Sequence, residues 1–273
     1  MPAEEFTFEY VPTDELNDNQ RWSTWFDVER LARGPEPRPS WVVTDNAAID
    51  TELGVIKSGK EADCFLLERA VPDDPDRRSL LVAKRYRSAE HRDFSRAGAY
   101  TDGRTTRRSR DNRAIKRKTT YGRQVIAGQW AVSEWNALCR LWSLGAPVPY
   151  PVQIDGTEIL MEYIEIDQEP APRLVNTRPD HDQLRLWWDQ LVAAMELFTE
   201  VGLAHGDLSP YNILALPDRL VIIDLPQVVD IAGNPSGMDF LHRDWVNVCT
   251  WFTRRGHEVD PEELFANLVA VAY

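Results

Sequence analysis

The chain has 273 residues, of which 43% are hydrophobic and ten are tryptophan, and its formal net charge at pH 7 is −13. This length supports one large domain or two lobes, and the apolar content excludes a chain that is disordered throughout. The acidic balance argues against a general nucleic-acid-coating protein, and no apolar run reaches the ~18 residues that a transmembrane helix needs.

Residues 1–50 are predicted to form an extension to the main domain. Their acidic start lacks the basic-then-apolar order of a signal peptide, and the three widely spaced cysteines fit reduced thiols, so we expect a cytoplasmic protein. The pattern of residues 19–33 favours a short helix. The proline-rich residues 34–39 favour a stiff connector.

Residues 51–166 are predicted to form a strand-rich lobe. Apolar runs at 54–56 and 64–67 flank a polar turn, and residues 80–84 make a third strand. Residues 85–123 then carry 13 lysines and arginines against four acids, which predicts a flexible basic loop over 85–125. Such a loop either contacts an anionic partner, such as RNA or the ribosome through residues 104–118, or is only solvated.

The rest of the chain is predicted to be mostly helical. A helix over 126–144 and a buried strand at 158–164 complete the first lobe. Residues 167–273 make the second lobe, with a long amphipathic helix over 182–201 that Asp180 caps. Strands followed by helices around a short polar hairpin predict an α+β fold with two lobes.

The densest chemical signal is the run His205-Gly-Asp-Leu-Ser-Pro-Tyr-Asn212, followed by an apolar strand that ends in Asp224. Asp207 and Asn212 are five residues apart in one loop, so both can point into one cleft. Carboxylate and carboxamide oxygens suit Mg²⁺ that carries nucleotide phosphates, and in phosphoryl transfer one aspartate orients the acceptor hydroxyl. The alternative is a plain turn cluster, because Asp, Asn, Ser and Pro are all common in turns.

A phosphotransferase also needs a cation for the nucleotide phosphates. Lys84 ends the run Leu80-Leu-Val-Ala-Lys84, which matches a strand pattern of protein-kinase-like folds. Glu134 in the following helix could pair with Lys84, or it could be an ordinary exposed acid. The upstream turn Ser58-Gly-Lys-Glu61 lies where a phosphate-covering loop would be, but its single glycine fits neither G-x-G-x-x-G nor a Walker loop.

Together these motifs resemble the RIO kinases, an atypical protein-kinase-like family, in the branch without an N-terminal winged helix. Ser58-Gly-Lys-Glu-Ala62 is similar to the family's nucleotide loop, Ser-Thr-Gly-Lys-Glu-Ala or Gly-x-Gly-Lys-Glu-Ser, and Pro39-Ser-Trp-Val-Val-Thr44 to the segment before it. His205-Gly-Asp-Leu-Ser-Pro-Tyr-Asn-Ile-Leu214 and Ile223-Asp-Leu-Pro-Gln227 resemble the catalytic and metal-binding loops. The resemblance covers roughly residues 39–255.

The resemblance implies a two-lobed protein-kinase-like fold with a truncated C-terminal lobe, and ATP and Mg²⁺ as cofactors. Asp207 would be the catalytic aspartate, and Asn212 and Asp224 would bind the metal. Asp224 could also accept phosphate, as is reported for some members. The residues implied in nucleotide binding are Ser58, Gly59, Lys60, Lys84, Glu134 and, in the linker that holds adenine, Glu162 and Ile164.

The implied function is that of an ATP-dependent serine/threonine protein kinase that phosphorylates a protein acceptor, itself included, or of an ATPase, with a role in ribosome maturation. Gly206 replaces the arginine of H-R-D, and only 49 residues follow Asp224, without an Ala-Pro-Glu motif, so conventional peptide recognition is not expected. Two alternatives stay open. One is a small-molecule kinase of the aminoglycoside or choline kinase type, and the other is a nucleotide-switched scaffold that binds RNA or the ribosome.

Overall fold

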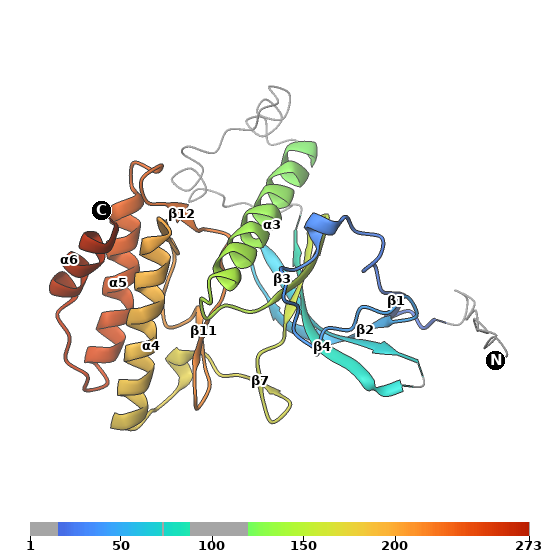
Figure 1. Ribbon diagram of the computed structural model, residues 1–273, viewed down its shortest axis with the longest axis horizontal. Helices are drawn as coiled ribbons and strands as arrows, with labels where there is room; N and C mark the ends of the chain where they lie inside the picture. The colour runs from blue at the N-terminus through green and yellow to red at the C-terminus, as the bar shows by residue number, and fades with distance from the viewer. Residues whose placement is uncertain (1–15, 73, 88–119, 273) are drawn as a thin grey trace, which may run out of the picture.

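The computed structural model describes residues 16–72, 74–87 and 120–272. The predicted RNA-contacting residues 104–118 lie outside this part of the chain. The main sheet lies on one side of the molecule and three helices lie on the other, with a fourth helix, α3, crossing between them (Figure 1). The predicted α+β class is therefore confirmed, while the predicted boundaries at residues 50 and 166 stay a prediction.

The main sheet is antiparallel, with the order β1-β2-β3-β4-β6-β5. Its strands are β1 (Gln20–Trp22), β2 (Ile49–Ser58), β3 (Ala62–Val71), β4 (Asp74–Tyr86), β5 (Pro151–Asp155) and β6 (Glu158–Glu162). Three small pairs join β7 (Glu165–Ile166) to β8 (Glu169–Pro170), β9 (Leu203–Ala204) to β12 (Val229–Asp230), and β10 (Ile213–Ala215) to β11 (Leu220–Ile222).

The helices are α3 (Thr120–Ser143), α4 (His181–Glu200), α5 (Gly237–Thr253) and α6 (Pro261–Ala272), with short 3-10 turns η2 (Arg30–Ala32) and η3 (Leu174–Asn176). The Asp180 side chain caps α4 by accepting a hydrogen bond from the backbone N–H of Gln183 at 2.8 Å, which confirms the predicted cap. No helix in the described ranges is long and apolar enough to span a bilayer.

The two faces of the main sheet have different roles because side chains alternate along each strand. Leu67, Leu81 and Ala83 are buried on the outer face. Lys84 and Tyr86 lie close to α3, since both contact Glu134 of that helix. Lys84 and Tyr86 of β4 thus point away from the outer face, towards α3.

The prediction of a helix over residues 19–33 was wrong. Residues 20–22 form β1 against the edge of β2, and only η2 is helical in this range. Trp22, Trp25 and Phe26 have helical spacing, but Trp25 is 3% exposed against the outer face of the sheet whereas Phe26 is 53% exposed. Strand pairing and the burial of Trp25 therefore decide the local structure.

A charged pair lies fully buried where this segment meets the sheet. The Arg69 guanidinium donates to both carboxylate oxygens of Asp50, at 2.6 and 2.9 Å, and neither side chain is exposed. Arg69 also donates to Gln153 Oε1 at 2.9 Å, and Gln153 Nε2 donates to Thr24 Oγ1 at 2.7 Å. The network joins β2, β3, β5 and the N-terminal segment.

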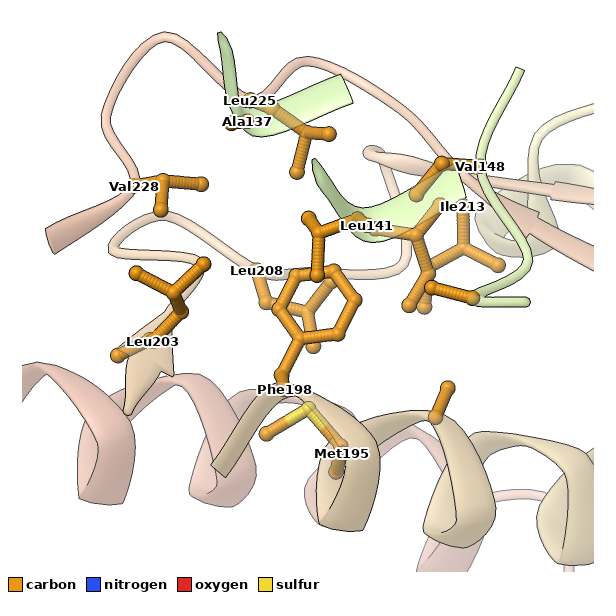
Figure 2. Packing of buried hydrophobic residues seen from close by; sticks show 14 of the residues in the cluster. Ala137, Leu141, Val148, Met195, Phe198, Leu203, Leu208, Ile213, Leu225 and Val228 are labelled. Carbon is orange, nitrogen blue, oxygen red and sulfur yellow. The ribbon is translucent and has the colours of Figure 1, made fainter. Parts of the chain in front are cut away.

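The core of the second lobe reaches into the loops that carry the polar motifs. Leu208 follows Asp207, Leu225 follows Asp224, and both are completely buried. In Figure 2 they lie around Phe198 of α4 and Leu141 of α3. Each motif therefore has an apolar anchor one residue away from its aspartate.

Candidate active site

Lys84 lies where the main sheet, α3 and the loop of Asp224 meet. Its Nζ lies 2.7 Å from Glu134 Oε1 on α3 and 2.7 Å from Asp224 Oδ1 after β11. The contact between Lys84 and Glu134 expected from the sequence is therefore present. The three residues come from a strand, a helix and a loop that are far apart in the chain.

The charges of this cluster stabilise one another. Burial works against the ammonium of Lys84, but Asp224 and Glu134 outweigh it and hold the pKa of Lys84 well above its usual value. The charge of Lys84 in turn lowers the pKa of Asp224 to about 2, against the opposing effect of burial. Lys84 and Asp224 are both ionised throughout the neutral range.

Glu134 also holds two groups that the sequence analysis did not identify. The Tyr86 hydroxyl donates to its second carboxylate oxygen, and the Leu225 N–H donates to Oε1 at 3.0 Å. Burial and the charge of Glu134 raise the pKa of Tyr86 well above its usual value, so this hydroxyl remains a donor. The signal for Tyr86 was its place two residues after Lys84, which puts both on one face of β4.

Asp207 and Asn212 lie in the loop between β9 and β10. Asn212 Nδ2 donates to the Asp207 carbonyl at 2.9 Å, and the Ile223 N–H donates to the Asn212 carbonyl at 2.9 Å. These bonds tie the loop to the strand that leads to Asp224. Asp224 itself has a φ of +69°, a region that non-glycine residues seldom occupy and that often marks a functional site.

The donor atoms left by these contacts suit Mg²⁺. The amide nitrogen of Asn212 is engaged and one oxygen of Asp224 contacts Lys84, which leaves one oxygen of each side chain for a metal. Within the described ranges no three or more His, Cys, Asp or Glu side chains gather as a ready-made metal site. Because Mg²⁺ is commonly held by one or two protein oxygens together with nucleotide phosphates, this donor set fits a metal that arrives with ATP.

Helix α5 supports the Asp207 loop through its backbone. The buried Asp244 accepts from the N–H groups of Gly206 at 2.7 Å and Leu208 at 2.9 Å, on either side of Asp207. Arg243 donates to the Gly206 carbonyl, and Asn247 donates to the Leu208 carbonyl at 3.1 Å. Burial raises the pKa of Asp244 to about 7. Sequence analysis missed these residues, although their spacing on a largely apolar helix was a usable signal.

His205 braces the same loop as a neutral ring. Its Nδ1 accepts from the Asp207 N–H at 3.3 Å, so its Nε2 is assigned as the donor to the Ile223 carbonyl at 3.1 Å. Burial lowers the pKa of His205 below its ordinary 6.5. It is a positioning residue.

We expect His205 to make the protein less stable as the pH falls below about 6.5, because the unfolded chain then binds a proton that the folded chain excludes. The contribution approaches ~1.4 kcal/mol per pH unit at most. Urea unfolding at several pH values should show a flatter pH dependence for His205→Asn than for the wild type. The control His181→Asn, at a largely exposed histidine, should keep the wild-type slope; equal slopes for all three proteins would contradict the prediction.

The turn between β2 and β3 lies near Asp224 and Lys84, whose charges act on the pKa of Glu61 in this turn. The Gly59 N–H donates to the Ala62 carbonyl at 2.9 Å, and a Cβ at Gly59 would approach the same oxygen to 2.9 Å. Ser58 pairs with Asp63 in the strand register, one position away from the pair formed by Cys64 and Lys84, so its side chain is turned to the outer face. Lys60 is exposed at the turn.

The predicted linker connects β6 to the second lobe. The Glu162 carboxylate accepts from the Tyr150 N–H at 3.0 Å. Ile164 is buried, and its carbonyl accepts from the Ala171 N–H at 3.0 Å. The linker is thus fixed at both ends, and its contact with adenine stays a prediction.

Comparison with known proteins gives one consistent family. A sequence model described as the RIO domain matches residues 79–264. The RIO-type serine/threonine-protein kinase Rio1 of Haloferax volcanii is 32% identical over 217 residues, which cover 80% of this chain and 68% of the relative. The serine/threonine-protein kinase RIO3 of Homo sapiens is 27% identical over 230 residues, which cover 82% of this chain and 43% of the relative.

A solved structure shares the fold. The crystal structure of the Rio2 kinase from Chaetomium thermophilum aligns with a TM-score of 0.57 and 23% identity, over 81% of this chain and 63% of that one. The same kinase, crystallised as an ADP/Mg²⁺-phosphoaspartate complex, aligns with a TM-score of 0.55. The chain therefore spans less than two thirds of these structures and of the human relative.

Proposed function

We propose that this chain, which belongs to the RIO domain family, is a RIO-like serine/threonine kinase that transfers the γ-phosphate of ATP to a protein hydroxyl. The class of enzyme follows from family membership, since its relatives are named RIO-type serine/threonine-protein kinases. The observation that carries the proposal for the site is the contact of Lys84 with both Glu134 and Asp224, at 2.7 Å each. It joins the sheet, α3 and the loop of Asp224 at one point in the cleft.

Each residue of the site has a role that follows from its surroundings. Lys84, held by Glu134, binds phosphate oxygens of ATP. Asn212 and Asp224 offer oxygens to Mg²⁺, which when bound neutralises charge on the phosphates. The oxygen of the acceptor hydroxyl forms a bond to the γ-phosphorus while ADP departs. Asp207 accepts the proton that this hydroxyl loses.

Autophosphorylation and ATP hydrolysis belong to the same proposal. The left-handed backbone conformation of Asp224 and its partly exposed carboxylate, with 39% side-chain exposure, support a role as transient phosphate acceptor. In that case the carboxylate oxygen attacks the γ-phosphorus, ADP leaves, and water later hydrolyses the acyl phosphate. A cytoplasmic location and a contact with RNA or the ribosome through residues 104–118 are further parts of the proposal, supported by the sequence alone.

We expect Lys84→Ala to lose both nucleotide binding and turnover, because Lys84 contacts the phosphates in the ground state as well as in the transition state. The purified protein is incubated with γ-labelled ATP and Mg²⁺, and protein-bound label and free phosphate are both measured. The proposal is supported if the wild type transfers label to protein or releases phosphate. It also requires that Lys84→Ala lowers this activity by at least about tenfold. The control Arg78→Ala removes an exposed cation of the same strand that has no role in the proposed site, and it should keep wild-type activity. Wild-type turnover in Lys84→Ala contradicts the assignment.

The two alternatives predict other results in the same experiment. A small-molecule kinase would bind ATP and transfer phosphate to an added aminoglycoside or choline, with no label on protein. A scaffold would bind ATP with neither transfer nor release. Family membership favours the protein kinase over both.

A further inference from the structure

A second lysine shares the cleft face of the sheet with Lys84. In the strand register Lys57 of β2 lies opposite Cys64 of β3, and Cys64 lies opposite Lys84 of β4. Directly opposed residues in antiparallel strands have their side chains on the same face, so all three form one row across the sheet. Lys57 therefore lies on the same face of the sheet as Lys84, and two strand spacings put their backbones about 10 Å apart.

The register also distinguishes Lys57 from its neighbour Ser58. Ser58 is paired with Asp63, which contacts Arg87 on the other face of the sheet. Between Val55 and Lys57 the register shifts by one residue, so Ile56 is the additional residue of a bulge. Because of this bulge, Lys57 rather than Ser58 lies on the face of the sheet that carries Lys84.

The charge of Lys57 is available, whereas that of Lys84 is already compensated. Lys84 has two carboxylates at 2.7 Å. Across the described residues, no carboxylate lies within ion-pair distance of Lys57, and this residue is exposed.

We propose that Lys57 binds the phosphate chain of ATP from above, as a second cation beside Lys84. The inference rests on the proposed function and adds a residue to its nucleotide site. A triphosphate entering the cleft meets Asp207, Asp224 and the partly buried Glu61, so Lys84 alone leaves an excess of negative charge. An unpaired ammonium forms strong charge-assisted hydrogen bonds with phosphate oxygens.

Aligned on Gly59-Lys60-Glu61, the two forms of the loop that this chain resembles have serine or glycine where this chain has Lys57. This makes Lys57→Ser a substitution that the fold should tolerate, and it makes the contact a feature of this chain rather than of the loop in general. Lys57→Arg keeps the charge and serves as the conservative variant. Arg78→Ser is the matched control, because Arg78 is an exposed cation of the same sheet whose one ion pair within the described ranges is a long 3.9 Å contact to Glu68.

The test is calorimetric titration of the 273-residue chain with ATP and with adenosine, both in the presence of Mg²⁺. Lys57→Ser should bind ATP about tenfold more weakly than the wild type, the loss of roughly one charge-assisted hydrogen bond, and bind adenosine unchanged. Lys57→Arg and Arg78→Ser should bind both as the wild type does. The KM for ATP in the labelled assay should rise by a similar factor in Lys57→Ser alone.

Two results would overturn the inference. One is unchanged ATP affinity in Lys57→Ser, and the other is an equal loss of ATP and adenosine affinity, which would indicate a change in pocket shape. If the wild type bound no ATP, the proposed function and this inference would fail together. If the wild type bound and turned over ATP and Lys57→Ser bound ATP with the same affinity, this inference alone would fail.

Discussion

Replacing Asp207 with alanine is expected to reduce phosphoryl transfer by about 10²–10⁴-fold while ATP binding is largely retained. In the proposed mechanism Asp207 acts on the acceptor hydroxyl, whereas Lys84, Asn212 and Asp224 bind the nucleotide and its metal. The fold should persist, because the loop is held through backbone groups on either side of Asp207 that bond to Asp244. The measurement is label transfer and phosphate release at saturating ATP, with nucleotide affinity determined separately.

The control for this variant is Asp189→Ala, which removes an exposed carboxylate from α4 without touching the cleft. It should behave as the wild type in both measurements. A parallel loss of ATP affinity and turnover in Asp207→Ala would show that the residue binds nucleotide rather than the acceptor. Unchanged turnover would remove Asp207 from the mechanism and favour the plain turn cluster considered from the sequence.

Asp50→Ala is expected to have the largest effect on stability, about 3–5 kcal/mol of the free energy of unfolding. The variant leaves the Arg69 guanidinium fully buried without its carboxylate, and among the described residues only Gln153 remains as its side-chain partner. Urea unfolding followed by tryptophan fluorescence measures the change. If Asp50→Ala does not fold, Asp50→Asn, which keeps one acceptor for Arg69, should fold with an intermediate loss.

Two comparisons separate burial from charge in this experiment. Arg77→Ala breaks an ion pair with Asp45 of similar length, 2.8 Å, but with much higher exposure, and it should cost about 0–1 kcal/mol. The double variant Asp50→Leu with Arg69→Met removes both charges and should recover much of the stability that Asp50→Ala loses. If Asp50→Ala were no more costly than Arg77→Ala, the buried pair would contribute little.

The candidate site residues could be proposed from the sequence because their signals are local. The spacing of Asp207 and Asn212, the strand that ends in Asp224 and the position of Lys84 all lie within short stretches. Their residue types are restricted by the chemistry of phosphate and metal binding. The pairing of Lys84 with Glu134, 50 positions apart, needed only the strand-then-helix order as additional information.

The features that sequence analysis missed depend on pairing between distant segments. β1 forms because it pairs with the edge of β2, and no local pattern in residues 19–33 indicates this pairing. The orientation of Ser58 and Lys57 depends on a bulge that shifts the register by one residue. Asp244 serves a loop 36 and 38 residues away, so its role became visible only when α5 was placed beside that loop.

The three contacts of Glu134 have a consequence for how this cleft can change state. A single carboxylate bonds to Lys84, Tyr86 and the backbone of Leu225, and so it joins β4, α3 and the loop of Asp224. An outward movement of α3 would break all three bonds at once and leave a buried ammonium with one partner fewer. Intermediate positions of the helix are therefore unfavourable, and assembly of the cleft should behave as an all-or-none transition.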